Sequence, residues 1–282
     1  MKHSLSAFLK LTTFELDRLS KFLFTLIGLT FLSNLIGYIM TPMKYMSRVN
    51  EYMATNSAPA SQALEQFGPF SFYNVINGLW IIGPIAIGIS GFLFYSVFIW
   101  YREWFGKNTF AYRLLMLPVS RMTLFFSKFS VIFIGIFTLI ATQLISLFIG
   151  YPIVSAIIES TYSSGQTLLE AIQMHPLLVY LFPIDLGFFM SVNGVGVILL
   201  LVLFTVILME RSFAVKGIFL GIVYAGVASM LVLFPLLLPD ILNNHYILYD
   251  SEVVIIEAVL MVIVGAISLM VSRYLLNNKI TV

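Results

Sequence analysis

Six long runs of apolar residues, separated by shorter polar segments, dominate the pattern of this chain. A bilayer core of about 30 Å requires a helix of roughly 20 apolar residues, because only a helix satisfies its own backbone hydrogen bonds where water is absent. The pattern predicts an all-α, polytopic integral membrane protein whose six transmembrane helices form a single permease domain over residues 1–282. The runs occupy residues 22–43, 75–101, 129–150, 184–209, 217–238 and 253–272.

The composition also indicates a membrane protein. Hydrophobic residues make up 60% of the chain and charged residues 10%, and the mean hydropathy is +1.00. A soluble domain carries about 25% charged residues. The chain has no cysteine, which excludes disulfides, thiol nucleophiles and thiolate metal sites.

The basic residues predict the orientation of the spans. When the six runs are folded back and forth, thirteen of the fifteen Lys and Arg residues fall on one side, and Lys44 and Arg48 fall on the other. Short cationic loops are retained in the cytoplasm, so both termini are expected to be cytoplasmic, in the plasma membrane of a bacterium. Topology explains the positive residues, and we expect no nucleic-acid partner.

The segments outside the runs predict shorter elements. Residues 4–20 show apolar positions at helical spacing, which predicts an amphipathic helix in the cytoplasmic interface. A plain extension of the first span is the alternative. The small residues and proline at 56–61 predict a loop within an outer segment at 44–74, and Thr167 to Met174 predicts a short helix that stops before Pro176.

No catalytic motif appears in the sequence. The three histidines are scattered without zinc-protease spacing, and the pair Gly106-Lys107 is followed by Asn108 rather than by the Ser or Thr of a phosphate-binding loop. We therefore expect no enzyme activity and no cofactor of the chain's own. If transport is driven by ATP, a separate polypeptide must bind the ATP and its Mg²⁺.

A few polar residues lie within the apolar runs. Gln143, Asn193 and Glu257 are the candidates for a translocation path, because polar groups inside a membrane are costly and often functional. For Glu257 the alternative is that its carboxylate reaches the outer interface from the first turns of the sixth span.

The long segment at 102–128 is basic and patterned. Gly106 and Asn108 predict a turn and an N-cap, so that Thr109 to Leu117 can form a short helix that Pro118 ends, and Ser120 can cap the next helix. The mixed apolar and basic surface of this short helix fits docking into a groove of another protein. Interfacial contact with the membrane is the alternative.

The segment Leu117-Pro118-Val119-Ser120-Arg121, followed by Ser127-Lys128, resembles the ABC-2 type permeases of ATP-binding cassette transporters. The resemblance implies that residues 102–128 form a cytoplasmic coupling loop that sits in a cleft of an ATPase subunit. It also implies that Glu103 occupies an acidic position of a polar relay, for which an ion pair with Arg102 or Arg113 is the alternative. The implied ATPase-coupling residues are Glu103, Phe105, Phe110, Arg113, Leu114, Leu117 and Arg121.

These expectations lead to one main function and two alternatives. The main expectation is a membrane-spanning subunit that works with two ABC ATPase subunits and a second permease, identical or related, and exports a hydrophobic or amphipathic peptide, lipid or drug. A membrane-embedded immunity or sensor protein for an antimicrobial peptide is one alternative. An ion-coupled secondary carrier is the other, although buried acids are few.

Overall fold

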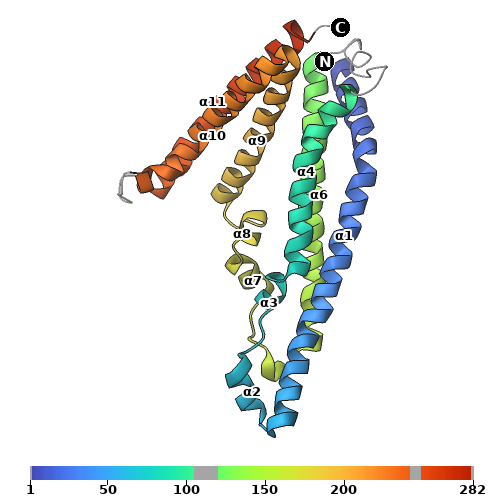
Figure 1. Ribbon diagram of the computed structural model, residues 1–282, viewed down its shortest axis with the longest axis vertical. Coiled ribbons are helices and arrows are strands. Elements are labelled where there is room, and N and C mark those ends of the chain that lie inside the picture. Colours follow the sequence, from blue (N-terminus) through green and yellow to red (C-terminus); the bar gives the residue numbers. More distant parts are fainter. Residues whose placement is uncertain (1, 105–119, 242–248, 281–282) are drawn as a thin grey trace. The chain divides into compact units, whose positions relative to one another are not determined.

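The described part of the chain is almost entirely helical. The computed structural model describes residues 2–104, 120–241 and 249–280 (Figure 1). Within these ranges no β-strand forms, and the β pairing is limited to an isolated bridge between Phe70 and Ser163. The all-α prediction is confirmed for these residues.

Six helices in the described ranges are long and apolar enough to cross a membrane. Their apolar side chains are not confined to one buried face, since Phe24, Phe94 and Met230 are 72%, 69% and 71% exposed. Such surfaces are stable against lipid and unfavourable in water. The chain thus has the make-up of a multi-pass membrane protein. The helices are α1 (Lys2–Asn56), α4 (Leu79–Trp104), α6 (Arg121–Ile157), α9 (Leu186–Phe213), α10 (Val215–Ile241) and α11 (Asp250–Asn278).

The helices are distributed over two compact units, which we describe separately. Helices α1, α4 and α6 each contribute residues to both units, whereas α9, α10 and α11 belong to one. The first unit consists of Met1–Asp17, Phe92–Phe133 and Pro183–Val282, and the second of Arg18–Gly91 and Ile134–Phe182.

Helix α1 is longer than the sequence pattern predicts. No break separates residues 4–20 from the apolar run at 22–43, because no glycine or proline occurs before Gly28. The residues of the expected amphipathic helix are therefore the first part of a longer helix. This continuity agrees with the alternative expectation, in which residues 4–20 extend the first span. The helix continues to Asn56, so much of the expected outer loop at 44–74 is helical as well. Its 55 residues correspond to about 80 Å, far more than a bilayer core.

Short helices build the rest of the second unit. The predicted loop at 56–61 is confirmed only for residues 57–59, since α1 includes Asn56 and α2 begins at Ala60. The predicted helix after Thr167 is also confirmed, because Thr167 and Glu170 form a capping box. These elements are α2 (Ala60–Phe67), α3 (Phe72–Ile76), the 3-10 helix η1 (Ser160–Tyr162), α7 (Leu168–Met174) and α8 (Leu178–Leu181).

A proline in α4 is accommodated by a side chain of α1. Pro84 has no amide hydrogen, so the carbonyl of Trp80 loses its helical donor. The hydroxyl of Ser33 donates a hydrogen bond of 2.7 Å to this carbonyl. The two helices approach closely here, because a Cβ atom added at Gly37 would lie 2.8 Å from Cβ of Trp80. Helix α4 consequently continues through Pro84 without interruption.

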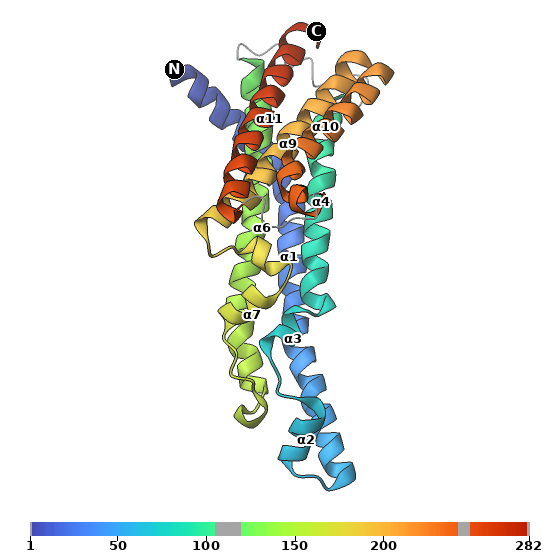
Figure 2. The ribbon, with the colours of Figure 1, turned by 90° about the vertical axis from the view of Figure 1, so that its left-hand side faces the viewer.

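In the first unit, α9, α10 and α11 pack against one another (Figures 1 and 2). The connection between α9 and α10 is very short, since Ala214 alone separates the two helices and has a positive φ of 50°. Gly217 then follows so close to α9 that an added Cβ would lie 2.1 Å from the carbonyl oxygen of Met209. Glycine is therefore required at this turn for steric reasons.

Replacing Gly217 by alanine should destabilise this turn by about 1–3 kcal/mol, because the new methyl group meets rigid backbone rather than a flexible side chain. Gly226→Ala in the same helix is the matched control, since no atom lies within 4 Å of a Cβ there. Thermal unfolding of the purified protein in detergent measures both. Equal melting temperatures for the two variants would contradict the assignment.

A histidine stabilises the second unit beyond α7. His175 is 2% exposed, and its Nδ1 atom accepts hydrogen bonds of 3.2 Å from the amides of Leu177 and Leu178. These bonds require an unprotonated Nδ1. Burial lowers the pKa of His175 from its ordinary value of 6.5, which agrees with a neutral ring in the folded protein.

The stability of the second unit should therefore fall in mild acid. A folded-state pKa below the unfolded value means that the folded protein binds fewer protons, so the contribution of His175 is complete above pH 6.5 and is lost as the pH falls through the folded-state pKa. We expect a loss of about 1–2 kcal/mol, the worth of two neutral hydrogen bonds. Unfolding of wild type and His175→Asn, compared from pH 8 to about pH 5, isolates this effect, because asparagine keeps an acceptor that does not titrate.

Candidate functional site

Four charged side chains meet in the first unit, where hydrophobic residues surround them. They come from three helices: Glu15 from α1, Arg102 and Glu103 from α4, and Lys128 from α6. Glu15 and Lys128 are 0% exposed and Glu103 is 2% exposed. Two acids and two bases give the cluster no net formal charge. We call this group the buried charge cluster.

Lys128 is the centre of the cluster. Its ammonium group donates to Glu15 Oε1 at 2.9 Å, to Glu103 Oε1 at 2.5 Å and to the carbonyl of Ile99 at 3.0 Å. An ammonium group has three donors, so each finds an acceptor. Arg102 completes the arrangement by donating to Glu15 Oε2 at 2.7 Å. Both oxygens of Glu15 therefore bind a cation, one on α4 and one on α6.

Aromatic rings exclude water from the cluster. The ammonium of Lys128 lies 5.4 Å from the centroid of the Trp100 ring, a favourable cation–π arrangement. Trp100 packs edge to face on Phe204 of α9, with ring centroids 5.4 Å apart, and Phe125 does the same. Ion pairs in such surroundings are strong, but their desolvation is costly. The arrangement is therefore intolerant of losing one partner.

Two arginines tie the neighbouring helix ends to the same unit. Arg121, at the start of α6, donates to the carbonyl oxygens of Leu276, in the last turn of α11, and of Ile280, two residues beyond the end of that helix. This bond pattern caps α11 with a cation, which suits the negative end of a helix dipole. The guanidinium of Arg211 in α9 lies over the rings of Tyr101 and Trp104, 4.4 Å and 5.0 Å from their centroids.

The implied coupling residues divide into two groups. Glu103 and Arg121 lie in the described ranges and make the contacts given above. Glu103 bonds to Lys128. Arg102, which the sequence analysis considered as an ion-pair partner of Glu103, bonds to Glu15 instead. The remaining residues lie in 105–119, outside the described residues. They are Phe105, Phe110, Arg113, Leu114 and Leu117.

The three residues considered for a translocation path have separate environments. Gln143 belongs to the second unit, where its side-chain oxygen accepts from Asn34 Nδ2 at 3.0 Å. Asn193 belongs to the first unit and donates to the carbonyl of Phe189 in its own helix at 2.8 Å. Glu257 is 5% exposed, and among the described residues it has no hydrogen bond or ion pair. No hydrogen bond within the described residues joins these three side chains.

The polar group around Gln143 is larger than the sequence indicated. Asn34 Nδ2 also donates to the hydroxyl of Ser146 at 2.9 Å, and Ser146 lies 3.2 Å from the hydroxyl of Tyr38. Asn34, Gln143, Ser146 and Tyr38 are all buried. The group joins α1 to α6 within the second unit, and a structural role in packing accounts for it.

Sequence reasoning missed two members of the buried charge cluster. Lys128 was counted as part of a cytoplasmic loop, but it lies seven residues inside α6. Glu15 lies on α1 among residues expected to face the interface. The sequence did contain one sign of the cluster, the position of Lys128 next to an apolar run, because a lysine in apolar surroundings needs an acidic partner. The sequence does not show which acid supplies it.

Comparisons with protein-family models, with curated proteins and with solved structures find no match to this chain. The function must therefore be argued from its own residues.

Replacing Lys128 by methionine should leave Glu15 and Glu103 buried without their shared cation, and the expected cost is about 3–5 kcal/mol. Adding Glu103→Leu to this variant should restore much of the stability, because Arg102 still neutralises Glu15. Thermal unfolding in detergent measures the wild type, both single variants and the double variant as a mutant cycle. Strict additivity of the two substitutions would show that the cluster is not energetically coupled.

Proposed function

We propose that this chain is the membrane-spanning subunit of an ATP-driven transporter of the ABC-2 permease type, in the plasma membrane of a bacterium. Both termini lie in the cytoplasm, as the distribution of Lys and Arg favours. The observation that carries the proposal is the buried charge cluster, because it joins three helices at the two flanks of the basic segment that resembles a coupling loop.

The flanks of that segment are firmly attached. Helix α4 ends at Trp104 and α6 begins at Arg121. Glu103, in the last turn of α4, and Lys128, two turns into α6, bond to each other and share Glu15. A displacement of residues 105–119 would therefore act on α1, α4 and α6 together. This is the mechanical property that a coupling loop needs.

The attachments extend to the other helices of the first unit. Arg121 bonds to the end of α11, and Arg211 places α9 against the end of α4. Closure of an ATPase pair around ATP and Mg²⁺ would pull on the loop and bias the spans between inward-open and outward-open arrangements. The permease contributes the pathway together with a second permease subunit, and the two ATPase subunits contribute hydrolysis.

The proposed cargo is hydrophobic or amphipathic. The spans contain few buried charges, and the chain contains 26 Phe and 13 Met residues, which suit an apolar path. Export of a peptide, lipid or drug fits this composition. The immunity or sensor function differs from this proposal in requiring no ATPase.

One observation favours a second candidate, an ion-coupled carrier. Glu257 lies two turns inside α11 and is buried without a partner among the described residues. A carboxyl group in such a position can bind a proton or a cation. The other polar candidate in the same unit, Asn193, is already bonded to its own helix. A carrier, like a sensor, would function without an ATPase.

The substitutions Arg113→Glu and Leu114→Glu should abolish association with the proposed ATP-binding cassette ATPase partner, while membrane insertion remains normal. The reason is that both residues belong to the mixed basic and apolar surface proposed to dock. Co-expression and affinity purification measure the association, and stimulated ATP hydrolysis measures coupling. Asn277→Glu with Asn278→Glu is the control, because it adds acidic charge to the exposed end of α11.

The absence of cysteine makes the orientation directly measurable. A single cysteine introduced at Ala111 should react with a membrane-impermeant maleimide only after the cells are opened. Labelling of that cysteine in intact cells would contradict the proposed cytoplasmic position of the coupling segment. Unchanged ATPase association and transport in the Arg113/Leu114 variant would refute the proposed coupling.

A further inference from the structure

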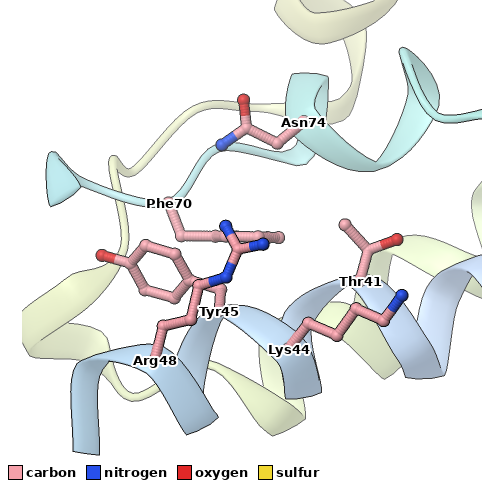
Figure 3. Close-up of a pocket in the computed structure, with 6 residues that line it drawn as sticks. All are labelled: Thr41, Lys44, Tyr45, Arg48, Phe70 and Asn74. Carbon is pink, nitrogen blue, oxygen red and sulfur yellow. The ribbon is translucent and has the colours of Figure 1, made fainter. Parts of the chain in front are cut away.

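A pocket of about 250 Å³ lies beside α1 in the second unit (Figure 3). Helix α1 forms its floor, and the segment from Phe70 to α3 forms its opposite wall. All of its lining residues belong to the second unit. They are Thr41, Lys44, Tyr45, Arg48, Phe70 and Asn74.

The two cations of the pocket are isolated in the sequence. Lys44 and Arg48 are the only basic residues between Lys21 and Arg102. They stand four residues apart on α1, so they share one face of the helix. Both are exposed, and neither forms an ion pair or a hydrogen bond within the described residues. Glu51 is the nearest acid along the helix, and within the described residues it forms no ion pair with either cation.

The aromatic wall of the pocket is fixed by contacts on both sides. The hydroxyl of Tyr45 donates to the carbonyl of Gly68 at 2.6 Å, and the rings of Tyr45 and Phe70 have centroids 5.0 Å apart. The backbone of Phe70 accepts from the amide of Ser164 at 2.9 Å and donates to the carbonyl of Tyr162 at 2.7 Å. The wall is thus formed before any ligand arrives, which reduces the entropy cost of binding.

The position of the pocket along α1 places it at the level of lipid headgroups. No charged residue occurs from Phe22 to Met43, and 22 helical residues correspond to about 33 Å, the thickness of a bilayer core. Lys44 is the first charged residue after this stretch, and Arg48 follows one turn further out. Tyr45 and Phe70 add the aromatic character typical of the membrane interface.

We propose that this pocket binds the phosphate group of an anionic phospholipid. The guanidinium of Arg48 offers paired donors to phosphate oxygens, and the ammonium of Lys44 offers a second positive charge. The hydroxyl of Thr41 and the amide of Asn74 line the same space as neutral donors. The aromatic wall contacts the glycerol and the first methylene groups of the lipid. This site is independent of the buried charge cluster and of the proposed coupling to an ATPase.

Native mass spectrometry of the full chain, purified in detergent with phosphatidylglycerol and phosphatidylcholine in equal amounts, tests the proposal. Wild type should retain phosphatidylglycerol in preference. Lys44→Gln with Arg48→Gln should lower its retention about tenfold or more, since each cation near a membrane surface contributes about a factor of five. Lys10→Gln with Lys21→Gln is the matched control, because it removes two exposed cations from the same helix. Lys44→Arg should retain the lipid.

Three outcomes would overturn the proposal. The first is equal retention by wild type and the Lys44/Arg48 variant. The second is an equal loss in the Lys10/Lys21 control, which would show attraction by net charge alone. The third is displacement of the lipid by an excess of inorganic phosphate, which would assign the pocket to a soluble phosphate compound. Thermal unfolding of each variant shows whether the fold is intact, and retention is compared among variants that melt with wild type.

Discussion

The interaction on which the first unit depends is the ion pairing of Lys128 with Glu15 and Glu103. In a membrane, apolar helix surfaces pack against lipid about as well as against one another, so hydrophobic burial does not select a unique arrangement of helices. A buried ammonium group does, because each of its donors must meet an acceptor. The three bonds of Lys128 fix α1 and α4 against α6 at one level. The aromatic residues Trp100, Phe125 and Phe204 then fill the space that remains.

The sequence predicted the parts of the fold that the bilayer imposes. Six apolar helices are required by length and backbone hydrogen bonding, so their existence could be inferred without knowledge of tertiary contacts. The sequence also predicted a short helix from Thr167 to Met174 that stops before Pro176, and α7 forms there. The length of α1 was not predictable in this way. The small residues at 56–61 do end the helix, but the polar residues between Lys44 and Asn56 are as compatible with a helix as with a loop.

The buried charge cluster shows why the candidate site was only partly predictable. Glu103 was identified from its neighbours in a motif, but its partner was not. Glu15 and Lys128 are 113 residues apart in the sequence, and Glu15 and Arg102 are 87 residues apart. Which charges pair depends on how α1, α4 and α6 are placed side by side, and hydrophobic periodicity gives no information about that placement. A lysine two turns inside an apolar helix is the one local sign that such a partner exists.

The same cluster limits how the protein can move under the proposed function. Separating Lys128 from its carboxylates in an apolar environment would cost several kcal/mol, comparable to the free energy that shifts a two-state equilibrium almost completely. The ends of α1, α4 and α6 should therefore move as one body when the coupling segment is displaced. The contacts between α9 and α10 are also rigid, because Gly217 lies against backbone. Weaker attachments, such as the cation–π contacts of Arg211 with Tyr101 and Trp104, cost far less to break. An alternating-access transition within the first unit would accordingly break contacts of this kind before it disturbs the cluster.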